Sequence, residues 1–359
     1  MSTRTNSSIK TNPGNYFEDF KMGQEIVHAT PRTITHGDVS LYTALYGMRF
    51  ATNSSDEFAR TALGLERAPV DDMLAFHMVF GKTVPDISLN AVANLGYANG
   101  KFVEPVYPGD TVTTTSTVLG LHENKGGKTG VVHVRSVGVN QRRETVLDYV
   151  RWVMVRKQDK DSPAPDTIVP DLPKAVDADD LTVPDNLQIE NYDAALAGSP
   201  HFWEDYEKGE KIDHVDGMTI EESDHMLATR LYQNTAKVHF NQHTERVGFF
   251  GRRIIYGGHI ISLARSLSFN GLANAFKVAA INGGRHVAPT FAGHTVYAWS
   301  EVLDTMEVPG HADLGALRLR TVATKDNACT EFPYKTEEGK YDLSVVLDFD
   351  YTVLMPKRN

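Results

Sequence analysis

The sequence has a single cysteine, Cys329, among its 359 residues. One cysteine excludes an intrachain disulfide and an all-cysteine metal site, and it fits a reducing compartment. No apolar run approaches the length needed to span a membrane, and residues 1–14 are polar, without the apolar core of a signal peptide. We therefore expect a cytoplasmic protein with no membrane partner and a disordered tail at residues 1–14.

Positive charge is also scarce. The chain has 36 Lys and Arg against 46 Asp and Glu, a formal net charge of -10. Binding to nucleic acid needs a basic surface, so we expect no nucleic-acid partner, although a local basic pocket for a phosphorylated ligand remains compatible with this balance. With 41% hydrophobic residues, the composition is that of an ordinary globular protein, and the chain is long enough for two domains with their own cores.

The most informative feature that is present is an internal repeat. Residues 16–20, YFEDF, are followed by Gly23, and they return 186 positions later as residues 202–206, FWEDY, followed by Gly209. Two further blocks recur in the same order: residues 103–112 return at 287–296, and residues 146–149 return at 346–349. Three blocks in one order indicate a single domain that occurs twice.

Residues 158–200, between the two copies, contain six prolines and many aspartates. This composition favours a long extended connector over a packed element. We therefore predict a first domain at residues 15–157, the connector at 158–200, and a second domain at residues 201–359.

Each copy shows the same predicted order of elements. A helix is expected to begin near Thr33 or Thr219, each followed closely by an acidic residue, and a second, apolar helix is expected at residues 73–81 or 260–269. Strands rich in Val and Thr then follow at 111–119, 131–139 and 145–155, and at 295–303, 317–323 and 343–354. A long helix wrapped by an antiparallel sheet is an α+β hot-dog fold. Two such units in tandem would form one continuous sheet with the helices against it.

The chemistry is expected in one stretch of the second copy. Residues 233–243, QNTAKVHFNQH, form a polar elbow that carries an amide and His239, and residues 251–259, GRRIIYGGH, lead into the apolar helix. This pattern places a titratable His beside the N-terminus of a buried helix. Free backbone N–H groups there, at Gly257 and Gly258, can receive negative charge that develops on a carbonyl oxygen.

The other histidines of this stretch are expected to be structural. His243 and His259 do not fall on catalytic positions. His239 and His243 stand four residues apart, as metal ligands on a helix would. However, no third ligand stands nearby and the elbow is not expected to be helical, so we expect no metal.

This stretch resembles the MaoC-like hydratases, whose motif reads Asp-x-Asn-Pro-x-His, then a loop, then an Ile-x-His-Gly turn into the hot-dog helix. His239 falls on the catalytic His of that motif and Asn234 on its catalytic Asp, while Tyr256 and Gly257 fall on the His-Gly pair. The resemblance implies an enzyme that acts on an acyl-CoA thioester.

The first copy lacks both catalytic groups, because Met48 stands at the position of Asn234 and Asn53 at that of His239. We therefore expect the second copy to carry the chemistry and the first to shape the groove for a long acyl thioester, although a purely structural first copy remains open. Candidate residues that hold a substrate carboxylate or the phosphates of coenzyme A are Tyr256, Lys237, Arg252, Arg253 and Arg285.

Hydration of an enoyl thioester needs a water over the β-carbon, a proton for the α-carbon, and donors for the enolate-like oxygen. Asn234 can orient water but cannot accept its proton at neutral pH. Either His239 is the sole acid–base group, which we favour, or a carboxylate such as Asp224 or Glu245 supplies the base. A neutral amide suits a substrate that brings its own negative charge, because two anions in a dry pocket repel each other.

A closer resemblance covers nearly the whole chain. Residues 76–97 (FHMVFGKTVPDISLNAVANLGY), 151–155 (RWVMV) and 234–240 (NTAKVHF) are similar to the mesaconyl-CoA hydratases, also called β-methylmalyl-CoA dehydratases. The resemblance implies a hydro-lyase that reversibly hydrates mesaconyl-CoA (2-methylfumaryl-CoA) to β-methylmalyl-CoA (erythro-3-methylmalyl-CoA) in the ethylmalonyl-CoA pathway of acetate assimilation. Coenzyme A is then part of the substrate, so no separate cofactor is expected, and the pseudo-dimeric chain is a candidate homodimer.

Three alternatives remain. An R-specific enoyl-CoA hydratase acting on fatty acyl chains would be expected to have Asp at position 234, where this chain has Asn. A hot-dog thioesterase would need a nucleophile or a base carboxylate on the central helix, and residues 260–269 contain no carboxylate. A non-catalytic acyl-CoA binding protein would be plausible if both elbows lacked the His, but only the first does.

Overall fold

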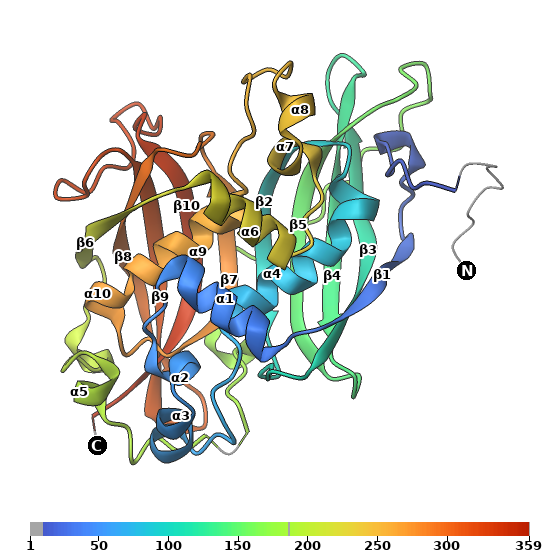
Figure 1. Cartoon of the computed structure of the whole chain (residues 1–359). Coiled ribbons are helices and arrows are strands. Elements are labelled where there is room, and N and C mark those ends of the chain that lie inside the picture. Colours follow the sequence, from blue (N-terminus) through green and yellow to red (C-terminus); the bar gives the residue numbers. More distant parts are fainter. Residues whose placement is uncertain (1–9, 186, 359) are drawn as a thin grey trace.

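The computed structural model describes residues 10–185 and 187–358, in which ten strands form one antiparallel sheet (Figure 1). The strands are β1 (Glu25–Thr33), β2 (Ala91–Phe102), β3 (Thr111–Glu123), β4 (Thr129–Val139), β5 (Thr145–Arg156), β6 (Lys211–Thr219), β7 (Lys277–His286), β8 (Thr295–Val308), β9 (His311–Lys325) and β10 (Val345–Pro356). Their order across the sheet is β1-β3-β4-β5-β2-β7-β10-β9-β8-β6. Each half of the chain supplies five neighbouring strands, and β2 pairs with β7 to join the halves. The predicted tandem of two hot-dog units with one continuous sheet is confirmed.

The Val- and Thr-rich strands lie where the sequence predicts them, because alternating side chains give each strand a buried and a solvent-facing side. In β3, buried residues alternate with partly exposed ones along most of the strand. The two central strands, β2 and β7, were not predicted. Arg285 was expected just before a strand, and it lies instead within β7.

Helices cover one face of the sheet (Figure 1). They are α1 (His36–Tyr46), α2 (Ala51–Ser54), α3 (Asp56–Leu63), α4 (Asp72–Thr83), α5 (Ala194–Ala197), α6 (Glu222–Leu231), α7 (Lys237–Phe240), α8 (Gln242–Glu245), α9 (Gly257–Leu267) and α10 (Phe269–Leu272), with short 3-10 or π turns η1 (Phe17–Asp19), η2 (Val84–Ser88), η3 (Ala178–Asp180) and η4 (Trp203–Asp205). The central helices α4 and α9 are buried along almost their whole length, which explains their nearly continuous apolar sequences. The second of them begins at Gly257, at the glycine pair that was predicted to open it.

The first helix of each half begins later than predicted. Thr33 and Thr219 are the last residues of β1 and β6, and α1 begins after Thr35. The Thr35 side chain accepts a hydrogen bond from the Asp38 N–H, and the Asp38 carboxylate accepts one from the Thr35 N–H. This capping box satisfies two N–H groups that the start of a helix would otherwise leave free.

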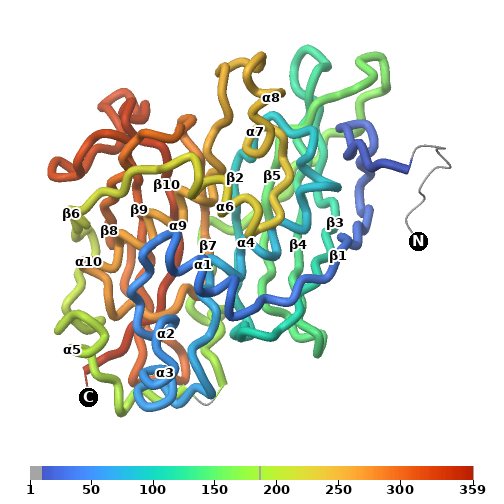
Figure 2. The backbone as a smooth tube through the Cα atoms, in the orientation of Figure 1, coloured from blue at the N-terminus to red at the C-terminus, as the bar shows by residue number. Residues whose placement is uncertain are grey.

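Helices of the first half pack on the second half. Figure 2 shows the blue segment of α1, α2 and α3 crossing in front of the strands of the second half. Phe58 of α3 belongs to one apolar cluster with Phe276 and Leu354 of the second half. The Tyr42 hydroxyl of α1 donates to Ser262 Oγ of α9 at 2.9 Å. The two halves therefore bury each other's surfaces, as two subunits of a dimer would.

The connector packs more than its composition predicts. Ile189 and Ala197 are buried and join the apolar cluster of α3. The Val176 N–H donates to Asn282 Oδ1 at 2.9 Å, and Ile168 forms an isolated β-bridge with Leu121. The prediction of an unpacked connector is wrong for these residues, because single apolar side chains between the prolines are enough to fill gaps on the surface of the sheet.

Residues 1–9 of the predicted tail lie outside the described residues. The expectation of disorder does not hold at residues 12–14, since Gly14 is buried against Leu89 and the Gly14 N–H donates to Asn12 Oδ1 at 2.9 Å. Among the helices of residues 10–185 and 187–358, none is both long and apolar enough to cross a membrane.

Candidate active site

A cavity of about 550 Å³ lies between the two halves of the chain. The second half contributes the elbow, the start of α9 and the end of β7, and the first half contributes β2, β5 and the residues that follow α4. Five predicted site residues line this cavity: Asn234, Lys237, His239, Tyr256 and Gly257.

His239 lies in α7, a single helical turn, so the elbow contains helix where none was expected. Its Nδ1 is 3.0 Å from the carbonyl oxygen of Ile254. Because a carbonyl only accepts, Nδ1 carries the proton and Nε2 keeps a lone pair. Burial lowers the pKa of His239 to about 4, although the hydrogen bond to Ile254 opposes this shift. The ring is therefore neutral at pH 7 and can accept a proton at Nε2. His243 lies in the separate turn α8 and is exposed.

Asn234 is buried at the turn between α6 and α7. Its Oδ1 accepts a hydrogen bond from the Ala236 N–H at 3.2 Å. Within the described residues the Asn234 amide nitrogen makes no hydrogen bond, so it is the polar atom of this side chain that remains for a water or a substrate.

The two glycines at the start of α9 have different surroundings. Gly257 is the first residue of the helix and lines the cavity, and a Cβ built on it would lie 2.4 Å from Cε1 of His286. A Cβ on Gly258 would lie 2.4 Å from the Tyr256 ring and 2.5 Å from the His77 ring. Gly258 is not part of the cavity lining, so its need for glycine comes from packing. Of the two predicted N–H donors, only Gly257 is at the cavity.

The predicted basic residues do not all meet at this cavity. Lys237 lines it and is exposed. The Arg252 guanidinium lies 3.9 Å from the centroid of the Phe291 ring, and Arg253 pairs with Glu222. These two arginines and the exposed Arg285 are not among the residues that line the cavity.

Sequence reasoning missed other residues of the lining, above all Arg151, which is 0% exposed on β5. A charged residue in the middle of an apolar strand was the available signal for it. Arg156 lies near the end of the same strand and is exposed. On the other side, Tyr97 of β2 and His286 of β7 are joined by a 3.1 Å hydrogen bond between the hydroxyl and Nε2. Both strands were absent from the prediction, so their side chains could not be placed.

Two carboxylates were considered as alternative bases. Glu245 of α8 lines the cavity, whereas Asp224, in the first turn of α6, does not. In the described part of the chain, Glu245 is the only acidic residue of the lining, against Arg151, Arg156 and Lys237. The cavity therefore has an excess of positive charge in a chain that is acidic as a whole.

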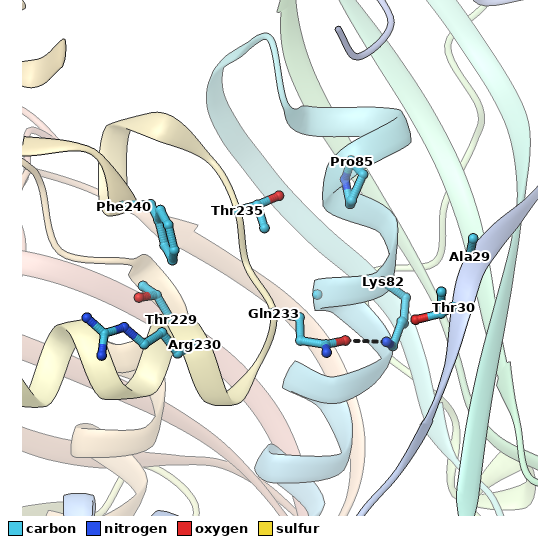
Figure 3. Close-up of a pocket in the computed structure, with 10 residues that line it drawn as sticks. Ala29, Thr30, Lys82, Pro85, Thr229, Arg230, Gln233, Thr235 and Phe240 are labelled. Atoms are coloured by element: carbon cyan, nitrogen blue, oxygen red, sulfur yellow. Dashed lines mark hydrogen bonds between the residues drawn. The ribbon is translucent and has the colours of Figure 1, made fainter. Parts of the chain in front are cut away.

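A second pocket of about 400 Å³ lies on the other side of the elbow (Figure 3). Figure 3 shows Lys82 of α4 donating a hydrogen bond to Gln233 Oε1. Thr235 and Phe240 line this pocket, whereas Asn234 and His239 line the cavity. The elbow thus forms the wall between the two spaces. Among the described residues no group of three or more His, Cys, Asp or Glu side chains could hold a metal ion.

Comparison with known proteins identifies the family of this chain. The sequence profile of the mesaconyl-CoA hydratase family matches residues 3–333. A β-methylmalyl-CoA dehydratase of Chloroflexus aurantiacus is 70% identical over 351 residues, which cover 98% of this chain and 99% of that protein. A mesaconyl-CoA hydratase of Cereibacter sphaeroides is 60% identical over 97% of this chain and 100% of that protein.

Solved structures show the same fold. A MaoC-domain dehydratase from Chloroflexus aurantiacus, 70% identical, superposes with a TM-score of 0.96 over 98% of this chain and 100% of that chain. A Mycobacterium tuberculosis protein with a double hotdog fold, 24% identical, superposes with a TM-score of 0.73 over 96% of this chain and 99% of that chain. From its sequence and its fold together, the chain belongs to the mesaconyl-CoA hydratase family of MaoC-like dehydratases.

Proposed function

We propose that this chain is a hydro-lyase that reversibly adds water to mesaconyl-CoA and forms β-methylmalyl-CoA. The observation that carries the proposal is a neutral His239 whose Nε2 has no partner among the described residues. It lies in one cavity with Gly257, the N-terminal residue of a buried helix. The names of two relatives that are 60% and 70% identical over nearly the full chain support the same reaction.

The charges of the cavity suggest how the substrate lies. Lys237 and Arg156 are exposed at its rim and can meet the phosphates of coenzyme A. The acyl group then extends inward past Gly257, whose N–H can donate to the thioester oxygen as that oxygen gains negative charge. Neither Arg252 nor Arg253 is needed for this placement, because both engage other side chains.

His239 can carry both proton transfers. Its Nε2 accepts a proton from water while the water oxygen bonds to the β-carbon, and the electrons of the double bond move to the thioester oxygen. The resulting imidazolium returns its proton to the α-carbon and the thioester carbonyl is restored. Because burial lowers the pKa of His239 to about 4, the imidazolium is a strong acid and gives up the proton readily. Asn234 can hold the water through its amide nitrogen.

We also propose a cytoplasmic location and a place in the ethylmalonyl-CoA pathway of acetate assimilation. The buried free thiol of Cys329 fits a reducing compartment, and the pathway is the one that the resemblance to the mesaconyl-CoA hydratases implies. A homodimer of the pseudo-dimeric chain belongs to the same proposal, and gel filtration with light scattering would test it.

The decisive assay follows the loss of enoyl-thioester absorbance with mesaconyl-CoA and, separately, with crotonyl-CoA. We expect hydration of mesaconyl-CoA and a drop in kcat of roughly 10²–10⁴-fold in His239→Ala, because that is the range for removal of a general acid–base group. His243→Ala is the matched control, since His243 is exposed and outside the cavity lining. Preference for crotonyl-CoA would favour a general R-specific enoyl-CoA hydratase, and release of free thiol would favour a thioesterase. No change in absorbance or thiol would leave an acyl-CoA binding protein.

A further inference from the structure

Arg151 is buried without an ionic partner. Its side chain lies in the middle of β5, is 0% exposed, and lines the cavity. Among the described residues no carboxylate pairs with it. A buried charge without a counter-charge is strongly destabilising, so a side chain of this kind is expected to have a partner that the free protein does not supply.

Neutral groups hold the guanidinium in place. Its Nη2 donates to Thr83 Oγ1 at 2.7 Å, and its plane lies over the Phe80 ring at 4.3 Å from the ring centroid. Its Nη1 is 3.4 Å from Asn94 Oδ1. These contacts orient the guanidinium but leave its charge uncompensated.

Two buried donors at this place have no acceptor. Nε of Arg151 and Nδ2 of Asn94 are both buried and make no hydrogen bond with the described residues, and both side chains line the cavity. An unsatisfied buried donor usually marks a missing acceptor. Two such donors beside one positive charge suit a carboxylate, because each of its two oxygens can accept a hydrogen bond.

The internal repeat shows that the buried arginine is present on only one of two equivalent strands, the one at the cavity of His239. β5 and β10 are equivalent strands, and Tyr351 stands where Arg151 stands in the first half. Tyr351 is buried, accepts a hydrogen bond from Thr321 Oγ1 at 3.0 Å, and stacks on Phe349. The cationic residue therefore occurs once, on the strand that faces the elbow with His239, and not on its counterpart.

We propose that Arg151, assisted by Asn94, binds the free carboxylate of the substrate and makes the enzyme specific for dicarboxylic acyl-CoA thioesters. The inference deepens the proposed function and rests on it. Mesaconyl-CoA carries its second carboxylate on the carbon that receives the hydroxyl group. Arg151 on the buried wall and the cations at the rim would then hold the two ends of one substrate, with the double bond at His239 between them.

Binding of two saturated analogues tests this assignment without turnover. Succinyl-CoA and butyryl-CoA have acyl chains of the same length and differ at the end, where one has a carboxylate and the other a methyl group. By isothermal titration, we expect the wild-type protein to bind succinyl-CoA more tightly than butyryl-CoA. Arg151→Gln should raise the Kd for succinyl-CoA by about 30-fold or more and change the Kd for butyryl-CoA little. Asn94→Ala should raise the Kd for succinyl-CoA by about fivefold. Arg135→Gln is the control, because Arg135 is an exposed arginine on the neighbouring β4 that pairs with Asp148.

The outcomes separate this inference from the proposed function. Equal binding of the two analogues by the wild-type protein overturns the inference, and so does an equal loss for both in a folded Arg151→Gln variant. If Arg151→Gln does not fold, Asn94→Ala and the wild-type preference decide. A clear preference for succinyl-CoA in a protein that does not hydrate mesaconyl-CoA would uphold the carboxylate site and reject the proposed reaction.

Discussion

The hydrogen bond between His239 Nδ1 and the Ile254 carbonyl decides which chemistry the His239 ring can perform. It fixes the tautomer, so that the lone pair of Nε2 is available. Burial adds a second effect, because it disfavours the charged ring and lowers the pKa of His239 to about 4 from an ordinary 6.5. The tautomer lets Nε2 accept a proton from water, and the low pKa keeps the ring neutral beforehand and makes the imidazolium release that proton readily.

This pKa predicts the acidic limb of the pH profile. His239 must be neutral to accept a proton, so kcat/KM for mesaconyl-CoA should stay level from pH 7 down to about 5 and fall as the pH passes about 4. The measurement is an initial-rate profile, with each sample returned to pH 7 to confirm that the enzyme survived. An acidic limb near 6.5 would show that the ring is not desolvated in the free enzyme.

Asn234 gives a second prediction at this scale. Asn234→Asp places a carboxylate in a buried part of the cavity that we propose also receives the carboxylate of the substrate, and two such anions repel each other by several kcal/mol at short range. We expect kcat/KM for mesaconyl-CoA to fall at least about tenfold more than that for crotonyl-CoA. Equal losses on the two substrates would remove the charge-repulsion argument.

At the residue scale, the sequence predicted which elbow residues lie together but not where most of the basic side chains lie. His239, Asn234 and Gly257 line one cavity, and they were predicted because a short motif carries them. Arg252 and Arg253 were predicted from nearness in sequence alone, and their side chains engage Phe291 and Glu222 instead. Nearness in sequence places a loop residue near a site but does not orient its side chain.

At the scale of elements, α4 makes a very close backbone contact with the turn after α6. A Cβ built on Gly81 would lie 1.7 Å from the Tyr232 carbonyl oxygen, which no side chain can tolerate. Tyr232 is just before the elbow. Contact with α4 of the first half therefore fixes the position of Asn234 and His239 in the cavity wall.

Gly81→Ala should therefore displace the elbow. We expect the free energy of unfolding to fall by about 1–3 kcal/mol, as in other overpacked cores, together with a loss of kcat. Chemical denaturation and the hydration assay measure the two effects. Gly37→Ala in α1 is the control, because the nearest atom to its Cβ would be 3.5 Å away and alanine favours helix. Its free energy of unfolding should stay level or rise by up to about 1 kcal/mol. A neutral effect of Gly81→Ala would mean that the turn is loosely held.

The strands show where element prediction from sequence stops. The strands with regular Val and Thr alternation were predicted because pattern and burial agree, as in β3. β2 and β7 lie at the centre of the sheet, with neighbours on both sides, and contain glycines and asparagines that weaken the strand pattern. Pairing with both neighbours stabilises them despite their composition.

At the scale of the whole molecule, five histidines surround the junction of the halves. His77, His225 and His259 are buried, and His239 and His286 are partly exposed. Burial lowers the pKa of each: His225 to about 2, His77 and His259 to about 3, and His239 and His286 to about 4. These values lie below the 6.5 expected in an unfolded chain. Between about pH 6.5 and 4 the unfolded chain therefore binds protons that the native protein does not.

This difference predicts a loss of stability in acid. As the pH falls below about 6.5, protonation stabilises the unfolded state, so the free energy of unfolding should decrease. Asp71 acts in the opposite direction, because burial raises its pKa to about 6, but it is one group against five. Thermal unfolding at constant ionic strength should give a Tm that falls steadily from pH 7 to 5. An unchanged Tm over that range would contradict the burial of these histidines.

The sequence by itself determined the repeat, the α+β tandem hot-dog fold and the elbow that carries His239, because local patterns and short motifs indicate each of them. Only the tertiary structure decided which side chains meet that His. Pairing of β2 with β7 brings β5 of the first half to the elbow of the second, and Arg151 reaches the cavity of His239 only through that pairing. Contacts between distant segments depend on how the two copies pack against each other, and no local pattern in the chain encodes that packing.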